Sequence, residues 1–227
     1  MQCMSGASTV TTLANLAEEQ WGLVTKGQAE STGMAWSTIA RLTSQGVLER
    51  VARGVYRLRG TPPVDHLELR AAWLQLAPDT PAWDRTADSG VVSHRSAAAV
   101  LGLGHLPADR HEFTIAVRRQ TRRPDVRLHR GQLERSDWMR LEGLPVTRPR
   151  RLAADLLADG EDPTAAAAAL ADAFRTGIDD PHAVATAIQP HAARYGLRRG
   201  DGFGLLSRLL ELTNDPQRSQ WIAQARP

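Results

Sequence analysis

The 227-residue sequence predicts a helix-rich α+β fold, in which an N-terminal winged helix-turn-helix precedes a larger mixed α/β C-terminal domain. Residues 23–58 carry two short helical patterns, joined through a glycine and followed by a short strand pair. Thr61-Pro62-Pro63 then interrupts any regular element. Beyond it, alternating apolar patterns are followed by long helical ones, so we expect domains at 1–60 and 61–227.

The two helices of the predicted helix-turn-helix have recognisable ends. Thr25 and Gln28 have the spacing of a capping box, in which a hydroxyl and a side-chain amide satisfy free backbone amides. Gly33 closes this first helix, and the second is expected over about 35–45. An apolar stripe predicts a further helix over 9–21, ahead of both.

A basic β-hairpin, the wing, is predicted directly after the second helix. Residues 47–51 and 55–58 read as strands, and Gly54 between them accommodates the left-handed backbone of a tight turn. An α-helix fits the major groove of DNA, and arginines pair with phosphate, so the polar positions of this segment are candidate DNA contacts. They are Thr25 and Lys26 at the first helix, Trp36, Ser37, Thr38, Arg41 and Ser44 on the second helix, and Arg50, Arg53, Arg57 and Arg59 on the wing.

The basic residues are almost all arginines. The formal net charge is only +3, but Lys26 is the single lysine among 28 basic residues. Guanidinium is the group best matched to phosphate and to the guanine edge, and a P-loop is excluded because its lysine is missing. Cys3 is the only cysteine, so neither a disulfide framework nor a zinc ribbon is expected. With no signal-peptide pattern and no long apolar run, we expect a cytoplasmic protein without a membrane segment.

The C-terminal half reads as a small sheet followed by helices. Two strands are expected across an arginine-rich turn, as a hairpin, and Thr147 is expected to cap the helix that follows the sheet. The arginines of the turn are a candidate contact for a partner or for more nucleic acid: Arg118, Arg119, Arg122, Arg123 and Arg127. The helices are expected at 66–76, 93–101, 147–157, 164–176, 181–195 with a break at Pro190, and 202–212, and the strands at 113–117, 126–128 and 144–146.

Catalytic constellations are weak throughout the sequence. Ser93-His94 lacks the glycine elbow of a hydrolase, so a capping serine beside a surface histidine is expected. The histidines show no metal-binding spacing, and Asp155 and Asp159 are expected to be solvated near a helix end. No Gly-Ser pair with spaced aspartates marks a nucleotidyltransferase. We therefore expect no enzyme, no metal and no cofactor.

Three phrases resemble the AbiEi family of antitoxins of type IV toxin–antitoxin systems. They are Val51-Ala52-Arg53-Gly54-Val55-Tyr56, the segment Val91–Ala98 (VVSHRSAA), and the segment Gly143–Pro149 (GLPVTRP). The resemblance covers roughly residues 9–160, and beyond them the likeness is only a helical pattern.

The resemblance implies an autoregulating transcriptional repressor that binds inverted repeats of operator DNA and counters a nucleotidyltransferase toxin. Because one winged helix reads only a few base pairs, we expect two copies on the DNA. The resemblance places the DNA contacts on the 35–45 helix and the 50–59 wing, and neutralisation in the C-terminal domain, with direct toxin contact left open. The arginine-rich turn could extend the DNA footprint, bind an acidic toxin or touch tRNA. The alternative is a protein-interaction module whose C-terminal domain sequesters a partner without sequence-specific DNA binding; a nucleic-acid enzyme is a third hypothesis.

Overall fold

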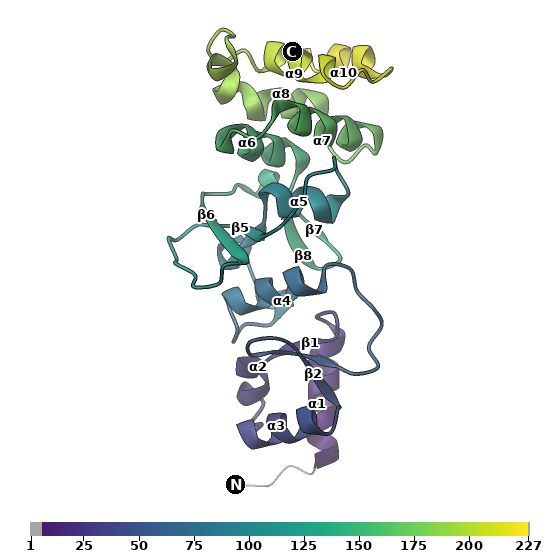
Figure 1. Cartoon of the computed structure of the whole chain (residues 1–227), viewed down its shortest axis with the longest axis vertical. Helices are drawn as coiled ribbons and strands as arrows, with labels where there is room; N and C mark the ends of the chain where they lie inside the picture. The colour runs from purple at the N-terminus through teal and green to yellow at the C-terminus, as the bar shows by residue number, and fades with distance from the viewer. Residues whose placement is uncertain (1–5, 227) are drawn as a thin grey trace. The chain divides into compact units, whose positions relative to one another are not determined.

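A computed structural model describes residues 6–226 of the chain (Figure 1), so Cys3 lies outside the described residues. It divides into two compact units, one of residues up to Gly90 with Glu142–Leu144, the other of Val91–Leu141 with the residues from Pro145 onward. The segment 61–90 therefore groups by its packing with the helix-turn-helix, while the functional division after residue 60 stays a prediction. Among the described helices, none is long and apolar enough to cross a membrane.

The first unit contains the predicted winged helix-turn-helix. Its strands form an antiparallel sheet in the order β1-β3-β2, with Val24 opposite Tyr56 and Glu49 opposite Arg57. Strand β1, whose last residue Thr25 begins the capping box, was not predicted. The elements are α1 (Gly6–Glu18), β1 (Leu23–Thr25), α2 (Lys26–Ser31), α3 (Trp36–Ser44), β2 (Leu48–Ala52) and β3 (Val55–Leu58).

A single apolar cluster holds these elements together. Leu13 of α1, Ile39 and Leu42 of α3, and Tyr56 of β3 are buried in it. Their helical spacing on α3 leaves the opposite face of that helix in solvent, as the sequence predicted. At the hairpin, Gly54 has the positive φ of 72° that the turn requires.

The rest of the first unit is a buried helix and two short 3-10 turns: α4 (Leu67–Leu76), η1 (Ala82–Asp84) and η2 (Ala87–Ser89). Trp73 is fully buried, and its indole donates to the carbonyl of Gly90 at 2.7 Å. The guanidinium of Arg85 lies 4.4 Å from the centre of the same ring and donates to the carbonyls of Trp73, Leu74 and Ala77. Burial lowers the pKa of Arg85 to about 10.

A buried hydrogen-bond network joins the helix-turn-helix to the segment that follows it. The predicted capping box is confirmed: the Gln28 amide nitrogen donates to Thr25 Oγ1, and the Thr25 amide donates to Gln28 Oε1. The side chain of Gln28 also donates to the carbonyl of Thr80 at 3.1 Å and bonds to Gln20. The Thr25 hydroxyl donates to the carbonyl of Pro78. Residues 78–80 thus complete the hydrogen bonding of α2.

The second unit is built on a five-stranded sheet in the order β6-β5-β4-β8-β7. Strands β5 and β6 are parallel, with His111 opposite Val126 and Ile115 opposite Arg130. The predicted hairpin is therefore wrong: the loop 116–125 is long enough to return the chain to the start of its neighbour. The elements are β4 (Val91–Val92), α5 (His94–Leu101), β5 (His111–Ile115), β6 (Val126–Arg130), η3 (Arg135–Asp137), β7 (Trp138–Leu141) and β8 (Leu144–Thr147).

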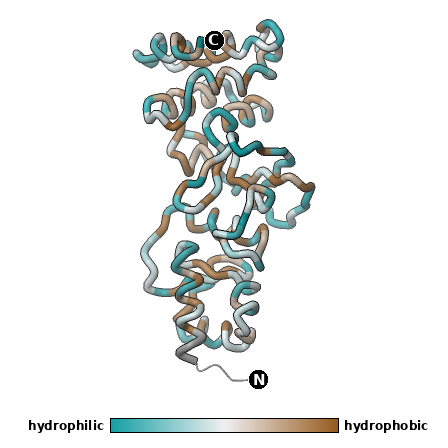
Figure 2. The backbone as a smooth tube through the Cα atoms, turned by 180° about the vertical axis from the view of Figure 1, so that it is seen from behind, coloured by the Kyte–Doolittle hydropathy of each residue, from teal (hydrophilic) through white to brown (hydrophobic). Residues whose placement is uncertain are grey.

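Helices stand together at one end of this sheet (Figure 1), and apolar and polar residues alternate along them (Figure 2). Thr147 does not cap the first of them, because it ends β8 and Arg148 takes the capping position without a side-chain bond. The predicted break at Pro190 is confirmed by a 3-10 segment. The elements are α6 (Pro149–Asp159), α7 (Pro163–Arg175), α8 (Pro181–Ile188), η4 (Gln189–Tyr195), α9 (Gly202–Glu211) and the unpredicted α10 (Arg218–Gln224).

Replacing Gln28 by alanine should destabilise the protein by about 2–4 kcal/mol, because the capping box is lost and buried partners stay unsatisfied. Urea unfolding followed by circular dichroism measures this. Glu30→Ala, on the exposed end of the same helix, should change the free energy of unfolding by no more than about 0.5 kcal/mol. Equal effects of the two substitutions would contradict the proposed contribution of the hydrogen-bond network to stability.

Candidate nucleic-acid interface

The exposed face of α3 carries four of the residues predicted to contact DNA. Trp36 is 50% exposed, and Ser37, Arg41 and Ser44 are exposed, whereas Thr38 is half-buried. The guanidinium of Arg41 donates to Gln45 at 3.0 Å. This single neutral bond leaves most of its donors directed to solvent.

Lys26 and Trp36 bring the starts of α2 and α3 together. The ammonium group lies 4.8 Å from the centre of the indole ring, within cation–π range, and 3.4 Å from the carboxylate of Glu30. An exposed indole held under a cation is a flat apolar surface with positive charge beside it. Bases or their methyl groups fit such a surface.

The wing presents arginines that no carboxylate neutralises. Arg50, Arg53 and Arg59 are exposed, and within residues 6–226 none of the three makes an ion pair. The backbone at the tip is held by Gln75, whose side-chain amide donates to the carbonyl of Arg53 at 2.6 Å. A fixed tip with free guanidinium groups suits contact with a phosphate backbone.

A cavity of about 670 Å³ separates the start of α2 from the wing. Lys26, Arg50 and Arg53 line it together with Trp36, and Asp79 with Glu30 supplies its acidic side. Neither Gln75 nor Asp79 was found by sequence reasoning, because both come from the segment assigned to the other domain. The basic and aromatic lining extends the surface of α3 toward the wing.

Two of the predicted DNA contacts are placed elsewhere by the structure. Thr25 is fully buried, and its hydroxyl is used by the capping box and by Pro78, so the prediction of a DNA contact is wrong for this residue. Arg57 is half-buried, and its guanidinium donates to the carbonyls of Thr61 and Pro62. It fixes the end of the wing and is not directed outward.

The predicted arginine cluster of the second unit divides into two groups. Arg118, Arg119 and Arg122 are exposed on the loop 116–125, which stands out beside β5 and β6 (Figure 1). Arg123 is paired with Asp125 and lowers the pKa of that carboxyl. Arg127 is also paired, with Glu112 at 3.5 Å and Asp159 at 3.1 Å.

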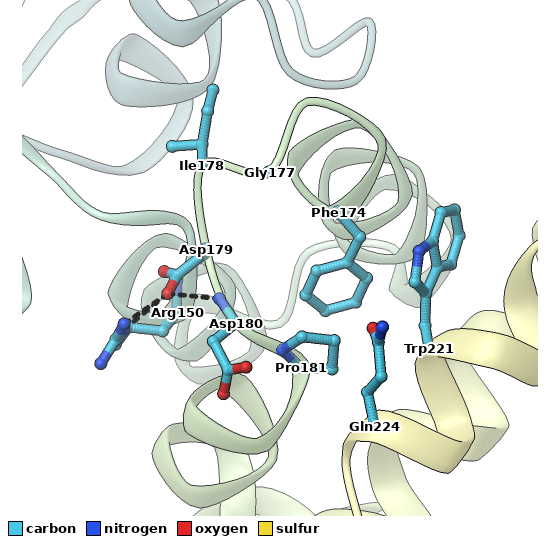
Figure 3. Close-up of a pocket in the computed structure, with 9 residues that line it drawn as sticks. All are labelled: Arg150, Phe174, Gly177, Ile178, Asp179, Asp180, Pro181, Trp221 and Gln224. Atoms are coloured by element: carbon cyan, nitrogen blue, oxygen red, sulfur yellow. Dashed lines mark hydrogen bonds and ion pairs between the residues drawn. The ribbon is translucent and has the colours of Figure 1, made fainter.

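A groove of about 720 Å³ lies at the start of α8 in the second unit (Figure 3). Its polar groups are satisfied: Arg150 donates to both oxygens of the buried Asp179, through its backbone amide and its guanidinium. Phe174 and Trp221 form a tilted aromatic pair with centroids 5.5 Å apart, and both are buried. The groove is thus a seam where α10 packs on α7 and α8.

The three-stranded sheet β1-β3-β2, its β2–β3 wing and the exposed helix α3 with Arg41 together form a winged helix-turn-helix. Residues 12–59 match the family described as "Transcriptional regulator, AbiEi antitoxin", so this part of the chain is an AbiEi antitoxin N-terminal domain. The resemblance seen in the sequence is confirmed there.

The whole chain is similar in fold to the RV2827C protein from Mycobacterium tuberculosis. The alignment has a TM-score of 0.53 and 18% sequence identity, and it covers 100% of this chain and 83% of that protein. No curated protein matches the chain. The solved structure therefore supports the two-part α+β architecture, and the family match supports a regulator of the antitoxin class.

Proposed function

We propose that the N-terminal unit binds double-stranded operator DNA and represses the operon that encodes this chain. In this proposal α3 enters the major groove and the β2–β3 wing follows the sugar–phosphate backbone. The observation that carries it is that Arg41, Arg50 and Arg53, on neighbouring elements, make no ion pair within residues 6–226. Pairing with phosphate supplies the missing partner and most of the affinity, and it releases counterions.

Sequence choice comes from α3, because only base edges carry sequence information. Arg41 is placed for the guanine edge, with Trp36 and Ser37 beside it at the start of the helix. One winged helix reads few base pairs, so we expect two copies of the chain on an inverted repeat. The family description, a transcriptional regulator, supports this assignment.

The second unit is proposed to counter a nucleotidyltransferase toxin, as the antitoxin family implies. The chain itself breaks no bond in this account. An exposed basic segment of this unit is the loop 116–125, where Arg118 and Arg122 could contact an acidic partner surface.

A second candidate function is favoured by two exposed indoles. Trp36 is 50% exposed and Trp83 is 44% exposed, and large exposed aromatic side chains are typical of protein interfaces. The first unit would then be a protein-interaction module. The first function requires DNA binding through Arg41 of α3 and the arginines of the wing, and the second does not.

Arg41→Ala should weaken binding to the operator by about 1–3 kcal/mol and relax the sequence preference at one position. Fluorescence anisotropy with the upstream DNA and with scrambled duplexes measures both effects. Arg199→Ala, an exposed arginine of the second unit, is the matched control and should leave both unchanged. Unaltered operator affinity of the Arg41 variant would remove this residue from the interface.

Arg53→Ala should lower affinity for every DNA sequence alike and reduce the slope of log K against log salt by about one. The reason is that a wing-tip guanidinium contacts phosphate and reads no base. Titrations at three salt concentrations give the slope. A loss confined to the operator sequence would instead assign Arg53 to base recognition.

The combined substitution of Arg41, Arg50 and Arg53 by alanine separates the two candidate functions in the full chain. We expect operator binding and repression to be lost while protection from the co-expressed toxin is kept, because the second unit is untouched. Growth assays and a promoter reporter measure the two outcomes side by side. Retained operator binding by a folded triple variant would overturn the DNA-binding proposal.

A further inference from the structure

A second cluster of polar side chains lies within the C-terminal unit, away from the groove of Figure 3. His94 begins α5, His129 lies on β6, and Asp159 ends α6. One donor atom from each lies within 4.8 Å of the donor atoms of the other two. His94 is buried, at 6% exposure, so the expected surface histidine beside a capping serine is wrong.

The three donor atoms are spaced slightly wider than in a loaded metal site. His94 Nε2 is 4.0 Å from Asp159 Oδ2, and the two imidazole rings are stacked with centroids 3.4 Å apart. A tetrahedral ion with bonds of ~2.1 Å places its ligand atoms roughly 3.4 Å apart. The His94 Nε2–Asp159 Oδ2 distance must therefore shorten by roughly 0.6 Å and the widest separation by up to roughly 1.4 Å, and the rings must splay so that their in-plane lone pairs converge. His129 lies on an edge strand, which leaves room for this movement.

Each of the two histidines has a further polar side chain within reach of one ring nitrogen. Ser93 Oγ lies 3.0 Å from His94 Nδ1, and Ser93 is fully buried although its side chain caps no helix. Its hydroxyl can accept the Nδ1 proton and leave Nε2 free as a ligand. Glu112 Oε1 lies 3.3 Å from His129 Nε2. Such partners orient the histidines of metal sites and raise their basicity.

The surroundings carry more negative than positive charge. Within the described residues, the carboxylates of Glu112, Asp137, Asp155 and Asp159 make ion pairs with two guanidinium groups, those of Arg127 and Arg151, and Glu112 also lies 3.3 Å from the imidazole of His129. Asp155, one turn before Asp159 on α6, is buried and has one oxygen with no hydrogen-bond partner within the described chain. Asp155 was expected to be solvated, and that expectation is wrong. A divalent cation would balance this excess.

The backbone of His94 is also unusual. Its φ is 52°, in the left-handed region that a residue with a side chain seldom adopts.

We propose that His94, His129 and Asp159 bind one divalent transition-metal ion of the zinc type, with water completing the shell. Two imidazoles and a carboxylate are a ligand set for Zn²⁺ and its neighbours and not for Mg²⁺. The ion fastens α5, β6 and α6 to one another. It takes the place of the Arg127 guanidinium on Asp159, and this arginine side chain, 48% exposed, turns to solvent.

Isothermal titration calorimetry of the full chain, freed of tags and chelated metal, tests the site with ZnCl₂ and MgCl₂. We expect one Zn²⁺ per chain, a higher melting temperature with zinc, and no response to Mg²⁺. Asp159→Asn and His129→Gln should lower zinc affinity at least about ten-fold, and Ser93→Ala by a similar factor through the loss of an orienting partner. His105→Gln, an exposed histidine outside the cluster, should bind zinc like the parent chain.

Arg127→Ala is expected to raise zinc affinity, an effect that misfolding cannot produce. Removing the guanidinium frees Asp159 and Glu112, so zinc affinity should rise severalfold. Absence of zinc binding by the parent chain, or binding that Asp159→Asn and His129→Gln leave unchanged, would overturn the proposal. Either result leaves the DNA-binding proposal intact, since the two sites share no residue.

Discussion

The buried side-chain amide of Gln28 is the contact on which the geometry of the N-terminal unit depends. It closes the capping box with Thr25, bonds to Gln20 next to β1, and donates to Thr80 beyond the wing. The start of α2 is thereby fixed against two other segments of the chain. Because α3 follows α2 after a short turn, the position of the exposed helix is fixed by the same bonds. This explains why the segment 61–90 groups with the helix-turn-helix.

Local signals in the sequence predicted the elements that depend on nearby residues. The capping box, the glycine of the wing and the break at Pro190 are decided within a few residues, and all three are confirmed. The parallel pairing of β5 with β6 and the position of Thr147 at the end of β8 depend on strands distant in the sequence. Two short apolar runs around a polar loop look alike whether they pair in parallel or as a hairpin. No local pattern separates the two.

The candidate site was predictable where helical periodicity decides exposure, as for Arg41 and Ser44. It was missed where a side chain already had a partner. The predicted capping box uses the hydroxyl of Thr25, so the pattern that predicted the box also indicated that this hydroxyl is not available to DNA. Arg57 is held by backbone carbonyls of the following turn, which no charge pattern reveals. Arg127 has its carboxylates on β5 and α6, far away in the sequence.

Arginine has two different roles in this chain, although the formal net charge is only +3. In the C-terminal unit, arginines compensate carboxylates taken out of water, as Arg95 does for Glu161 at 2.7 Å. In the N-terminal unit, Arg41 of α3 and the arginines of the wing tip have no such carboxylate among residues 6–226. The compensation is incomplete at one place: burial raises the pKa of Asp155 to about 6 although Arg151 lies 2.8 Å away. The second oxygen of Asp155 has no hydrogen-bond partner within the described residues, so the loss of hydration outweighs the attraction of Arg151 at this position.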